Sequence, residues 1–329
     1  MRKSPLAGRV SQIEFSLPEK SESNRDLLTE NPNWDIDKIY EKTGISRRYI
    51  SAPGQTAADL CVDAAEKIFR SGTVTRSEID LLLFCTQSPD YILPTTACII
   101  QDRLELPKRA AAFDFNLGCS GFVYGLAVAG SMVDSGLSEN ALLLCGETYT
   151  KYIHANDRTC RPIFSDAGTA TLIQRSERPL IGPFELGTDG KGHCNLIIPS
   201  SGARSPDNVT ARGARLKMDG ASVFMFTMSA VPESVNNLLE TAGIALEDVD
   251  LFFFHQASKL VLDNIVRNLA LPPAKVIRDM ETLGNTVSAT IPIALRRAAD
   301  AGRLSPGQLV MLVGFGVGNS WGACLLRWE

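Results

Sequence analysis

The sequence lacks the features that would indicate a metal protein, a membrane protein or a disulfide-stabilised domain. It has only three histidines, and none stands at metal-ligand spacing from a second ligand residue. Its eight cysteines form no CxxC pair, which indicates the reduced thiols of a cytoplasmic protein. No apolar stretch is long enough to span a membrane, and the amino-terminal residues do not form a signal peptide. We therefore expect no metal, no membrane segment and no secretion.

Positive charge is not in excess either. The chain has 33 Lys and Arg against 37 Asp and Glu, a formal net charge of −4, so it offers no basic field for a nucleic acid. A hydrophobic content of 44% is that of an ordinary globular protein. At 329 residues the chain exceeds the usual size of a single core, and we expect two closely packed halves.

What the sequence does contain is an internal repeat. Three segments recur in the same order and at nearly constant offset, which indicates a duplication with pseudo-twofold symmetry. The matches pair Asp80-Leu-Leu-Leu-Phe-Cys85 with Asp250-Leu-Phe-Phe-Phe-His255, Leu117-Gly-Cys119 with Leu283-Gly-Asn285, and Leu142-Leu-Leu-Cys-Gly146 with Val310-Met-Leu-Val-Gly314. We place the halves at residues 1–178 and 179–329, with a boundary near Arg178-Pro179.

Strands and helices alternate in both halves, so the sequence predicts an α/β protein. The expected strands are 79–85, 110–115, 141–145, 167–173, 249–254, 275–277 and 308–313, most of them apolar runs typical of strands buried on both faces. The expected helices are 57–69, 95–104, 121–132, 223–242, 259–269 and 290–301, of which 121–132 is small and apolar enough to be central. The polar segment Gly187 to Ala214 is expected to form a long loop pair near a cleft or a subunit contact.

Cys119 is the candidate nucleophile. It stands between a strand and a helix, with Gly118 and Gly121 beside it, as in a nucleophile elbow. The positive end of the helix is expected to favour the thiolate. The alternative is a small buried residue, which is how we interpret Cys61, Cys98, Cys145 and Cys324.

His255 and Asn285 occupy the matching places in the second half. Because strand ends in open α/β sheets face the ligand crevice, the duplication should bring both residues and Cys119 to one cleft. The Asn285 amide can donate a hydrogen bond to a developing oxyanion, although a structural histidine and an ordinary turn asparagine are the alternatives. The glycine-rich segment Gly314 to Gly322 is expected to be a turn that supplies a backbone donor. His154 and His193 lie in polar loops and are expected to be solvated.

These residues carry a family resemblance. The motifs Asn-Leu-Gly-Cys119-Ser-Gly-Phe, His255-Gln-Ala-Ser, Gly-Asn285-Thr and Gly-Phe-Gly-Val-Gly-Asn-Ser-Trp-Gly together resemble a β-ketoacyl-[acyl-carrier-protein] synthase III of the thiolase-like superfamily. The resemblance covers almost the whole chain. It implies a five-layered αβαβα fold built from two duplicated halves, a homodimer and a Cys-His-Asn triad.

The resemblance also implies roles. Cys119 accepts an acyl group from acyl-CoA, which is a substrate, so no cofactor is expected. His255 and Asn285 then hold the carbonyl of a malonyl thioester, on CoA or on an acyl carrier protein, as carbon dioxide leaves. The backbone at Cys119 and Val317, beside Gly316, forms the oxyanion hole. The remaining substrate-binding positions implied are Lys42, Arg158, Met218, Phe224 and Leu93, the last of which caps the acyl pocket of the partner subunit.

The sequence departs from the family at several positions. Ser258 replaces an asparagine, which rearranges a supporting hydrogen bond, and the β-branched Val317 replaces a common glycine and narrows the pocket. Lys38 replaces a tryptophan that stacks on the CoA adenine in some members. Met225 and Leu260 replace basic residues associated with carrier docking, for which Lys259 and Arg267 are possible substitutes.

Three alternatives to condensation stay open. A synthase-III-like acyltransferase of a specialised-metabolite or surface-glycan pathway would pass the acyl group to an amine or hydroxyl, with His255 as general base. A hydroxymethylglutaryl-CoA-synthase-like enzyme would need a glutamate where this chain has Gln87. A non-catalytic scaffold would have no need of the triad.

Overall fold

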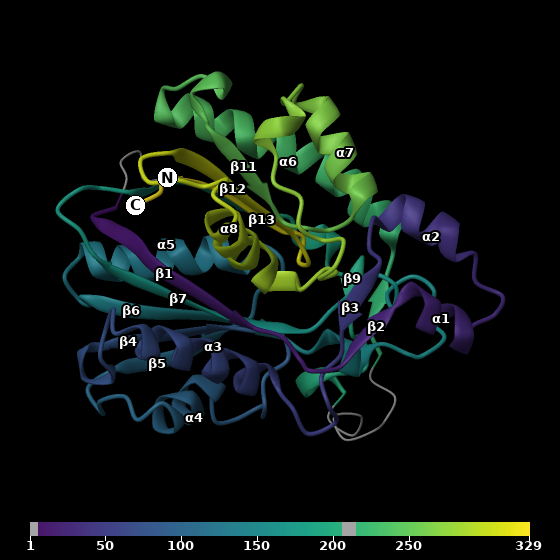
Figure 1. Ribbon diagram of the computed structural model, residues 1–329, viewed down its shortest axis with the longest axis horizontal. Helices are drawn as coiled ribbons and strands as arrows, with labels where there is room; N and C mark the ends of the chain where they lie inside the picture. Colours follow the sequence, from purple (N-terminus) through teal and green to yellow (C-terminus); the bar gives the residue numbers. More distant parts are fainter. Residues whose placement is uncertain (1–5, 206–214) are drawn as a thin grey trace.

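Two mixed β-sheets form the frame of the computed structural model, which describes residues 6–205 and 215–329 (Figure 1). The first sheet has the order β1-β7-β6-β4-β5 and the second the order β11-β12-β13-β8. The strands of the first are β1 (Gly8–Ser16), β7 (Ala167–Arg175), β6 (Asn140–Glu147), β4 (Leu81–Cys85) and β5 (Ala111–Phe115). Those of the second are β11 (Leu251–Phe254), β12 (Leu309–Gly316), β13 (Ser320–Arg327) and β8 (Ile181–Thr188). Along the chain, β7 of the first sheet ends at Arg175 and β8 of the second begins at Ile181.

The two sheets repeat one another in detail. Strand β4 pairs in parallel with β6, with Leu81 opposite Ala141, and β11 pairs in parallel with β12, with Leu251 opposite Val310. The aspartate before each first strand also does the same work. Asp80 accepts the Glu139 N–H at 2.9 Å, and Asp250 accepts the Leu309 N–H at 2.8 Å, so each carboxylate holds the chain that enters the neighbouring strand.

Helices cover and separate the sheets to give five layers, αβαβα (Figure 1). Helices α3 (Ala57–Ser71) and α4 (Thr96–Arg103) cover the outer face of the first sheet, and α6 (Gly220–Ala242) and α7 (Lys259–Asn268) cover that of the second. The middle layer contains α5 (Gly121–Asp134) and α8 (Thr290–Asp300). The remaining elements are α1 (Asn24–Glu30), α2 (Ile36–Thr43), β2 (Ser21–Ser23), β3 (Arg47–Tyr49), β9 (Leu196–Ile197) and β10 (Lys217–Met218).

Burial on both faces explains the apolar runs of the central strands. In β4, Leu82 and Phe84 pack with α3 and α4, whereas Leu81, Leu83 and Cys85 pack with α5 in the middle layer. Strand β11 divides in the same way, with Phe253 toward the middle layer and Phe252 and Phe254 toward α6 and α7. The thiolase-like architecture that the motifs implied is confirmed.

The structure corrects two expected elements. The segment 275–277 forms only a bridge between Phe252 and Val276 instead of a strand. The glycine-rich segment from Gly314 is largely strand, because β12 runs to Gly316 and β13 begins at Ser320. Glycine is needed at Gly314 for packing, since a Cβ there would lie 2.8 Å from the Cys119 carbonyl oxygen.

Other differences concern boundaries and edges. Helix α6 begins at Gly220, earlier than expected, because the Asp219 carboxylate accepts the N–H groups of Ala221 and Ser222, both at 3.1 Å. Of the expected loop pair at 187–214, residues 206–214 lie outside the described part, and the rest includes β9, which pairs with β10. Strands β1, β8 and β13 were not expected. Strand β1 is only partly buried and mixes polar with apolar residues, β8 contains Pro183, and β13 begins inside the glycine-rich segment that was expected to be a turn.

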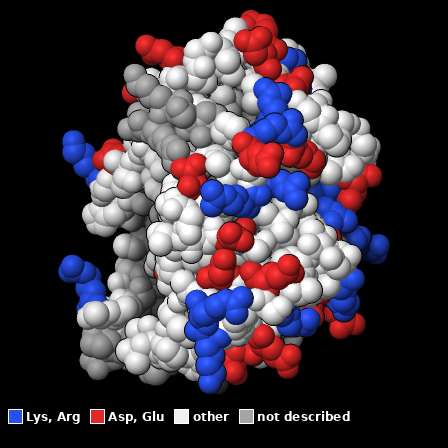
Figure 2. All heavy atoms as spheres, turned by 90° about the vertical axis from the view of Figure 1, so that its left-hand side faces the viewer, with Lys and Arg blue, Asp and Glu red and all other residues white. Residues whose placement is uncertain are grey.

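Two surface properties follow from the composition. On the face shown in Figure 2, Lys and Arg side chains are interspersed with Asp and Glu. Such a mixture is what nearly equal numbers of the two signs predict. Among residues 6–205 and 215–329, no helix has both the length and the apolar character needed to cross a membrane.

Candidate active site

Cys119 lies in a tight turn between β5 and α5. The Gly121 N–H donates to the Gly118 carbonyl at 2.8 Å, and the thiol residue is only 4% exposed. Strand β12 of the other half passes directly beside the sulfur, since a Cβ on Gly316 would lie 2.9 Å from Cys119 Sγ. The glycine at 316 therefore allows a backbone to approach a nucleophile in a way that no side chain would permit.

Burial dominates the acidity of this thiol. It raises the pKa of Cys119 to about 12, while the backbone N–H groups of Cys119 and Val317 lower it. The buried Glu147 adds a smaller increase, but burial raises the pKa of Glu147 itself to about 8, so that this carboxyl is mostly uncharged at neutral pH. Burial therefore outweighs the stabilisation of a thiolate that was expected from the positive end of the helix. The two N–H groups nevertheless face the sulfur, where the oxyanion hole was predicted.

His255 stands at the end of β11 and is 2% exposed. Burial lowers its pKa to about 3, so the imidazole is neutral at physiological pH. Its Nδ1 lies 2.8 Å from the Thr290 hydroxyl at the start of α8, and its Nε2 lies 3.4 Å from Asn285 Nδ2. The ring is therefore oriented from behind by Thr290 and points its other nitrogen at Asn285.

Asn285 is fixed by the backbone around it. Its N–H donates to the Ile163 carbonyl at 2.9 Å, and its Oδ1 accepts the Val287 N–H at 2.9 Å. With the oxygen occupied, the amide Nδ2 faces His255 and the Ala257 carbonyl, 3.5 Å away. Val287 reaches this geometry with a φ of +56°, a conformation uncommon for a β-branched residue.

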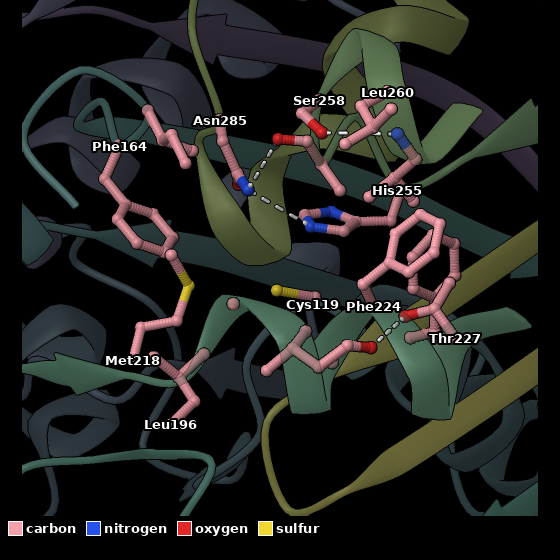
Figure 3. Close-up of a pocket in the computed structure, with 17 residues that line it drawn as sticks. Cys119, Phe164, Leu196, Met218, Phe224, Thr227, His255, Ser258, Leu260 and Asn285 are labelled. Atoms are coloured by element: carbon pink, nitrogen blue, oxygen red, sulfur yellow. Dashed lines mark hydrogen bonds between the residues drawn. The ribbon is translucent and has the colours of Figure 1, made fainter. Parts of the chain in front are cut away.

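The three residues line one space, which we call the inner cavity. It has a volume of about 160 Å³, and Gly316, Met218, Phe224 and Ser258 also line it. In Figure 3 the side chains of Cys119, His255 and Asn285 point into this space from both halves of the chain. The structure thus brings together the residues that the internal repeat predicted to meet.

A larger outer cavity of about 790 Å³ adjoins the inner one. Met218 and Phe224 line both cavities, and Lys42 and Arg158 line the outer one, where their cationic side chains are exposed. Four of the five expected substrate-binding residues therefore lie along one route to Cys119. The fifth, Leu93, is 79% exposed and lines none of the described cavities of the single chain.

The structure also shows which of the other cysteines and histidines are buried and which are exposed. All eight cysteines are free, and Cys61, Cys145 and Cys324 are buried as expected, but Cys98 is exposed on α4. The apolar neighbours of Cys98 suggested burial, but its side chain lies on the solvent face of the helix. His154 and His193 are exposed, as predicted. Ser258 caps α7, accepting the Val261 N–H at 3.4 Å.

The sequence analysis missed Thr290 and Glu147. Glu147 ends β6, is completely buried, and accepts the Gln87 N–H at 3.0 Å and the Ser88 hydroxyl at 2.8 Å. A carboxylate directly after the apolar run Ala141 to Gly146 was the available signal, because it falls where the second half has Phe315. Thr290 gave no signal, since its role depends on the position of His255 in space.

Comparison with known proteins agrees with this geometry. Residues 113–190 match the model of 3-oxoacyl-[acyl-carrier-protein] synthase III, and residues 239–328 match the model of its C-terminal part. The chain is 35% identical to a β-ketoacyl-[acyl-carrier-protein] synthase III of Desulfitobacterium hafniense, covering 95% of both chains. It is 36% identical to one of Symbiobacterium thermophilum, covering 97% of both.

Solved structures give the same result. A crystal structure of a 3-oxoacyl-(acyl-carrier-protein) synthase III superposes with a TM-score of 0.94 at 42% identity, covering 98% of this chain and 100% of that one. Identity at this level over nearly the full length, together with four motifs that meet in space, shows the family. The chain belongs to the β-ketoacyl-[acyl-carrier-protein] synthase III family of thiolase-fold acyltransferases, as its motifs predicted.

Proposed function

We propose that this protein transfers an acyl group from acyl-CoA to Cys119 and condenses it with a malonyl thioester. The observation that carries the proposal is the meeting of Cys119, His255 and Asn285 in one cavity, with two backbone N–H groups directed at the sulfur. No cofactor takes part in this scheme, and acyl-CoA is a substrate.

In the first half-reaction Cys119 Sγ attacks the thioester carbonyl of acyl-CoA. A new carbon–sulfur bond forms, the bond to the CoA sulfur breaks, and CoA leaves as a thiol with the proton that Cys119 gave up. The N–H groups of Cys119 and Val317 stabilise the oxyanion of the tetrahedral intermediate. Because the resting thiol is neutral, it loses its proton as the bond forms.

In the second half-reaction His255 and Asn285 hold the carbonyl oxygen of the malonyl thioester. The bond to its carboxylate breaks, carbon dioxide leaves, and the electron pair forms an enolate. The enolate carbon attacks the acyl carbonyl, the bond to Cys119 breaks, and the sulfur recovers a proton. A histidine with a pKa of about 3 suits this step, because a neutral donor stabilises the enolate without protonating its carbon.

The outer cavity is the proposed entry for the thioester arm. Lys42 and Arg158 at its rim would pair with the phosphates of CoA, since ammonium and guanidinium groups are the usual phosphate partners. Met218 and Phe224 would line the passage to Cys119. Whether the malonyl unit arrives on CoA or on a carrier protein is decided at this mouth, where Met225 and Leu260 are exposed.

A homodimer in the cytoplasm completes the proposal. Strand β5 is an edge of the first sheet, Phe113 on it is 38% exposed, and the adjoining loop exposes Ile92 and Leu93. An exposed strand edge with apolar neighbours is a ready surface for pairing with a second copy, whose acyl pocket Leu93 would then reach. Eight free cysteines support a reducing compartment.

The test measures both half-reactions. Intact mass after incubation with acyl-CoA should show one acyl group on Cys119, and addition of malonyl-CoA or malonyl-carrier should release carbon dioxide with a product two carbons longer. Acyl-Cys119 that ignores both malonyl donors but is discharged by an amine or alcohol would overturn condensation. The apolar Met225 and Leu260 at the mouth keep that acyl-transfer function as the second candidate.

A further inference from the structure

A second space lies on the other side of the Cys119 thiol, and we call it the side cavity. It has a volume of about 300 Å³ and is lined by Gln87, Asn116, Tyr149, His193, Leu196, Ile197, Ile198, Ser201, Leu216, Val317 and Gly318. Cys119 packs in one cluster with Tyr149, Leu196 and Leu216 from this lining. An acyl group on the sulfur can therefore extend away from His255 and Asn285 into the side cavity.

Gln87 is a polar residue of this lining that lies beside the turn carrying Cys119. A Cβ on Gly118, the residue before Cys119, would lie only 2.6 Å from Gln87 Oε1 and 2.7 Å from a methyl group of Val317. The carboxamide of Gln87 thus passes directly over the backbone next to the thiol. Glu147 anchors the backbone of this residue, because its buried carboxyl group accepts the Gln87 main-chain N–H at 3.0 Å.

A chain of hydrogen bonds makes this part of the cavity wall polar. The Tyr149 hydroxyl donates to Gln87 Oε1, and Gln87 Nε2 donates to Asn116 Oδ1 at 2.8 Å. One hydrogen on Gln87 Nε2 and both on Asn116 Nδ2 make no hydrogen bond among the described residues. The wall therefore offers several hydrogen-bond donors to a group that enters the side cavity.

These donors determine which acyl chain fits. A plain alkyl chain would cover the amide groups without pairing them, and a buried polar group left unpaired is costly. An oxygen function on the acyl chain would accept their hydrogen bonds. The cavity volume stands at the low end of the range for ligand pockets, which favours a short chain.

We propose that the acyl group selected by this enzyme is short and carries a hydroxyl close to the thioester, as in a 3-hydroxyacyl-CoA. The proposal rests on the proposed loading of Cys119. The hydroxyl oxygen accepts a hydrogen bond from the amide of Gln87 or Asn116, while the hydroxyl hydrogen can be accepted by Tyr149. An alkyl chain of the same length has no hydroxyl and can form neither hydrogen bond.

The experiment compares two thioesters that differ by one hydroxyl, butyryl-CoA and 3-hydroxybutyryl-CoA. Initial rates of covalent loading are followed by intact mass. We expect the wild-type protein to load the hydroxylated group at least about tenfold faster, because a site built to hydrogen-bond a hydroxyl rejects the analogue without it. Gln87→Leu should reduce this preference to near unity, and Tyr149→Phe should weaken it.

Tyr152→Phe is the matched control. Tyr152 lies three residues after Tyr149 on the same short helix, but its side chain does not line the side cavity. Removing its hydroxyl should therefore leave the preference for the hydroxylated group unchanged. Asn116→Ala, at an exposed position, tests the same donors if Gln87→Leu does not fold. Equal or faster loading of butyryl-CoA by the wild type would overturn the proposal, as would an unchanged preference in both Gln87→Leu and Asn116→Ala. Loading of neither thioester would instead overturn the proposed function itself.

Discussion

The two halves of this chain use one architecture for opposite purposes. At the end of β4 the first half has Cys85, which is completely buried and donates from its thiol to the Leu117 carbonyl at 3.1 Å. At the matching end of β11 the second half has His255, which reaches the inner cavity. One element later the first half has Cys119, the proposed nucleophile, and the second half has Asn285, the proposed donor. The comparison teaches that duplication fixed the positions, while later divergence divided the chemistry between them.

The sharpest test of this division replaces Cys119 and Cys85, one at a time. Cys119→Ala should abolish covalent acyl loading while the protein stays folded, because no other cysteine lines the inner cavity. Cys85→Ala, its neighbour on the same sheet edge, should still load acyl groups. Intact mass and peptide mapping after incubation with acyl-CoA give the answer, and an acyl group mapped to Cys85 or Cys160 would show the assignment to be wrong.

The donors of the second half should matter for a different step. His255→Ala and Asn285→Ala should each slow decarboxylation of the malonyl thioester about a hundredfold or more, since one oxyanion donor contributes roughly 3 kcal/mol. Acyl loading should fall much less. Separate assays of labelled carbon dioxide release and of acyl-enzyme formation make the comparison. Equal losses in both would mean that His255 mainly activates Cys119.

The halves should also differ in their response to pH. Because the pKa of Cys119 is about 12, its thiolate fraction should rise about tenfold per pH unit between pH 7 and 9, and alkylation mapped to the Cys119 peptide should rise with it. His255, with a pKa of about 3, stays neutral throughout, so decarboxylation should be level from pH 5.5 to 8. A fall in decarboxylation below a midpoint near 6.5 would show that His255 titrates normally and is not desolvated.

The smallest effect concerns Thr290, a positioning residue behind His255. In this structure the Thr290 hydroxyl lies 2.8 Å from Nδ1 and donates its hydrogen to the Val287 carbonyl at 3.0 Å. For Nε2 to donate to the malonyl carbonyl, Nδ1 must accept, so the Thr290 hydroxyl must turn from Val287 and donate to Nδ1. Thr290→Val keeps the shape but removes this donor, and we expect the decarboxylation rate to fall about tenfold with little change in KM. Thr290→Ser should restore most of the rate, whereas a merely structural role would leave the Val variant active.

Much of this arrangement could be predicted from the sequence. The strands β4, β6, β11 and β12 are apolar because they are buried on both faces, and that burial is what made the repeat visible. The convergence of Cys119, His255 and Asn285 followed from the topology of strand ends. Strands β1 and β13 could not be recognised in this way, because β1 is only partly buried and carries polar residues, and β13 begins inside the glycine-rich segment.

The side-chain contacts could not be predicted from the sequence for a different reason. Cys119 stands at a helix start, which favours a thiolate, but its acidity depends on how much water the folded protein excludes from it. Thr290 contacts His255, 35 residues earlier, and Gln87 contacts Tyr149, 62 residues later, and no local pattern records those contacts. Cys98 shows the opposite error, since an apolar local sequence does not fix which face of a helix meets solvent.

The shared middle layer has one more consequence. Residues of α5 pack against strands of both sheets, and the Ser120 and Ser320 hydroxyls, one from each half, hydrogen-bond at 2.7 Å beside the nucleophile. Separating the halves would break this hydrogen bond and expose the apolar middle layer, so we expect a substrate to reach Cys119 through the outer cavity while the halves stay together. A thioester at the end of a flexible arm suits such an approach to a residue that is only 4% exposed.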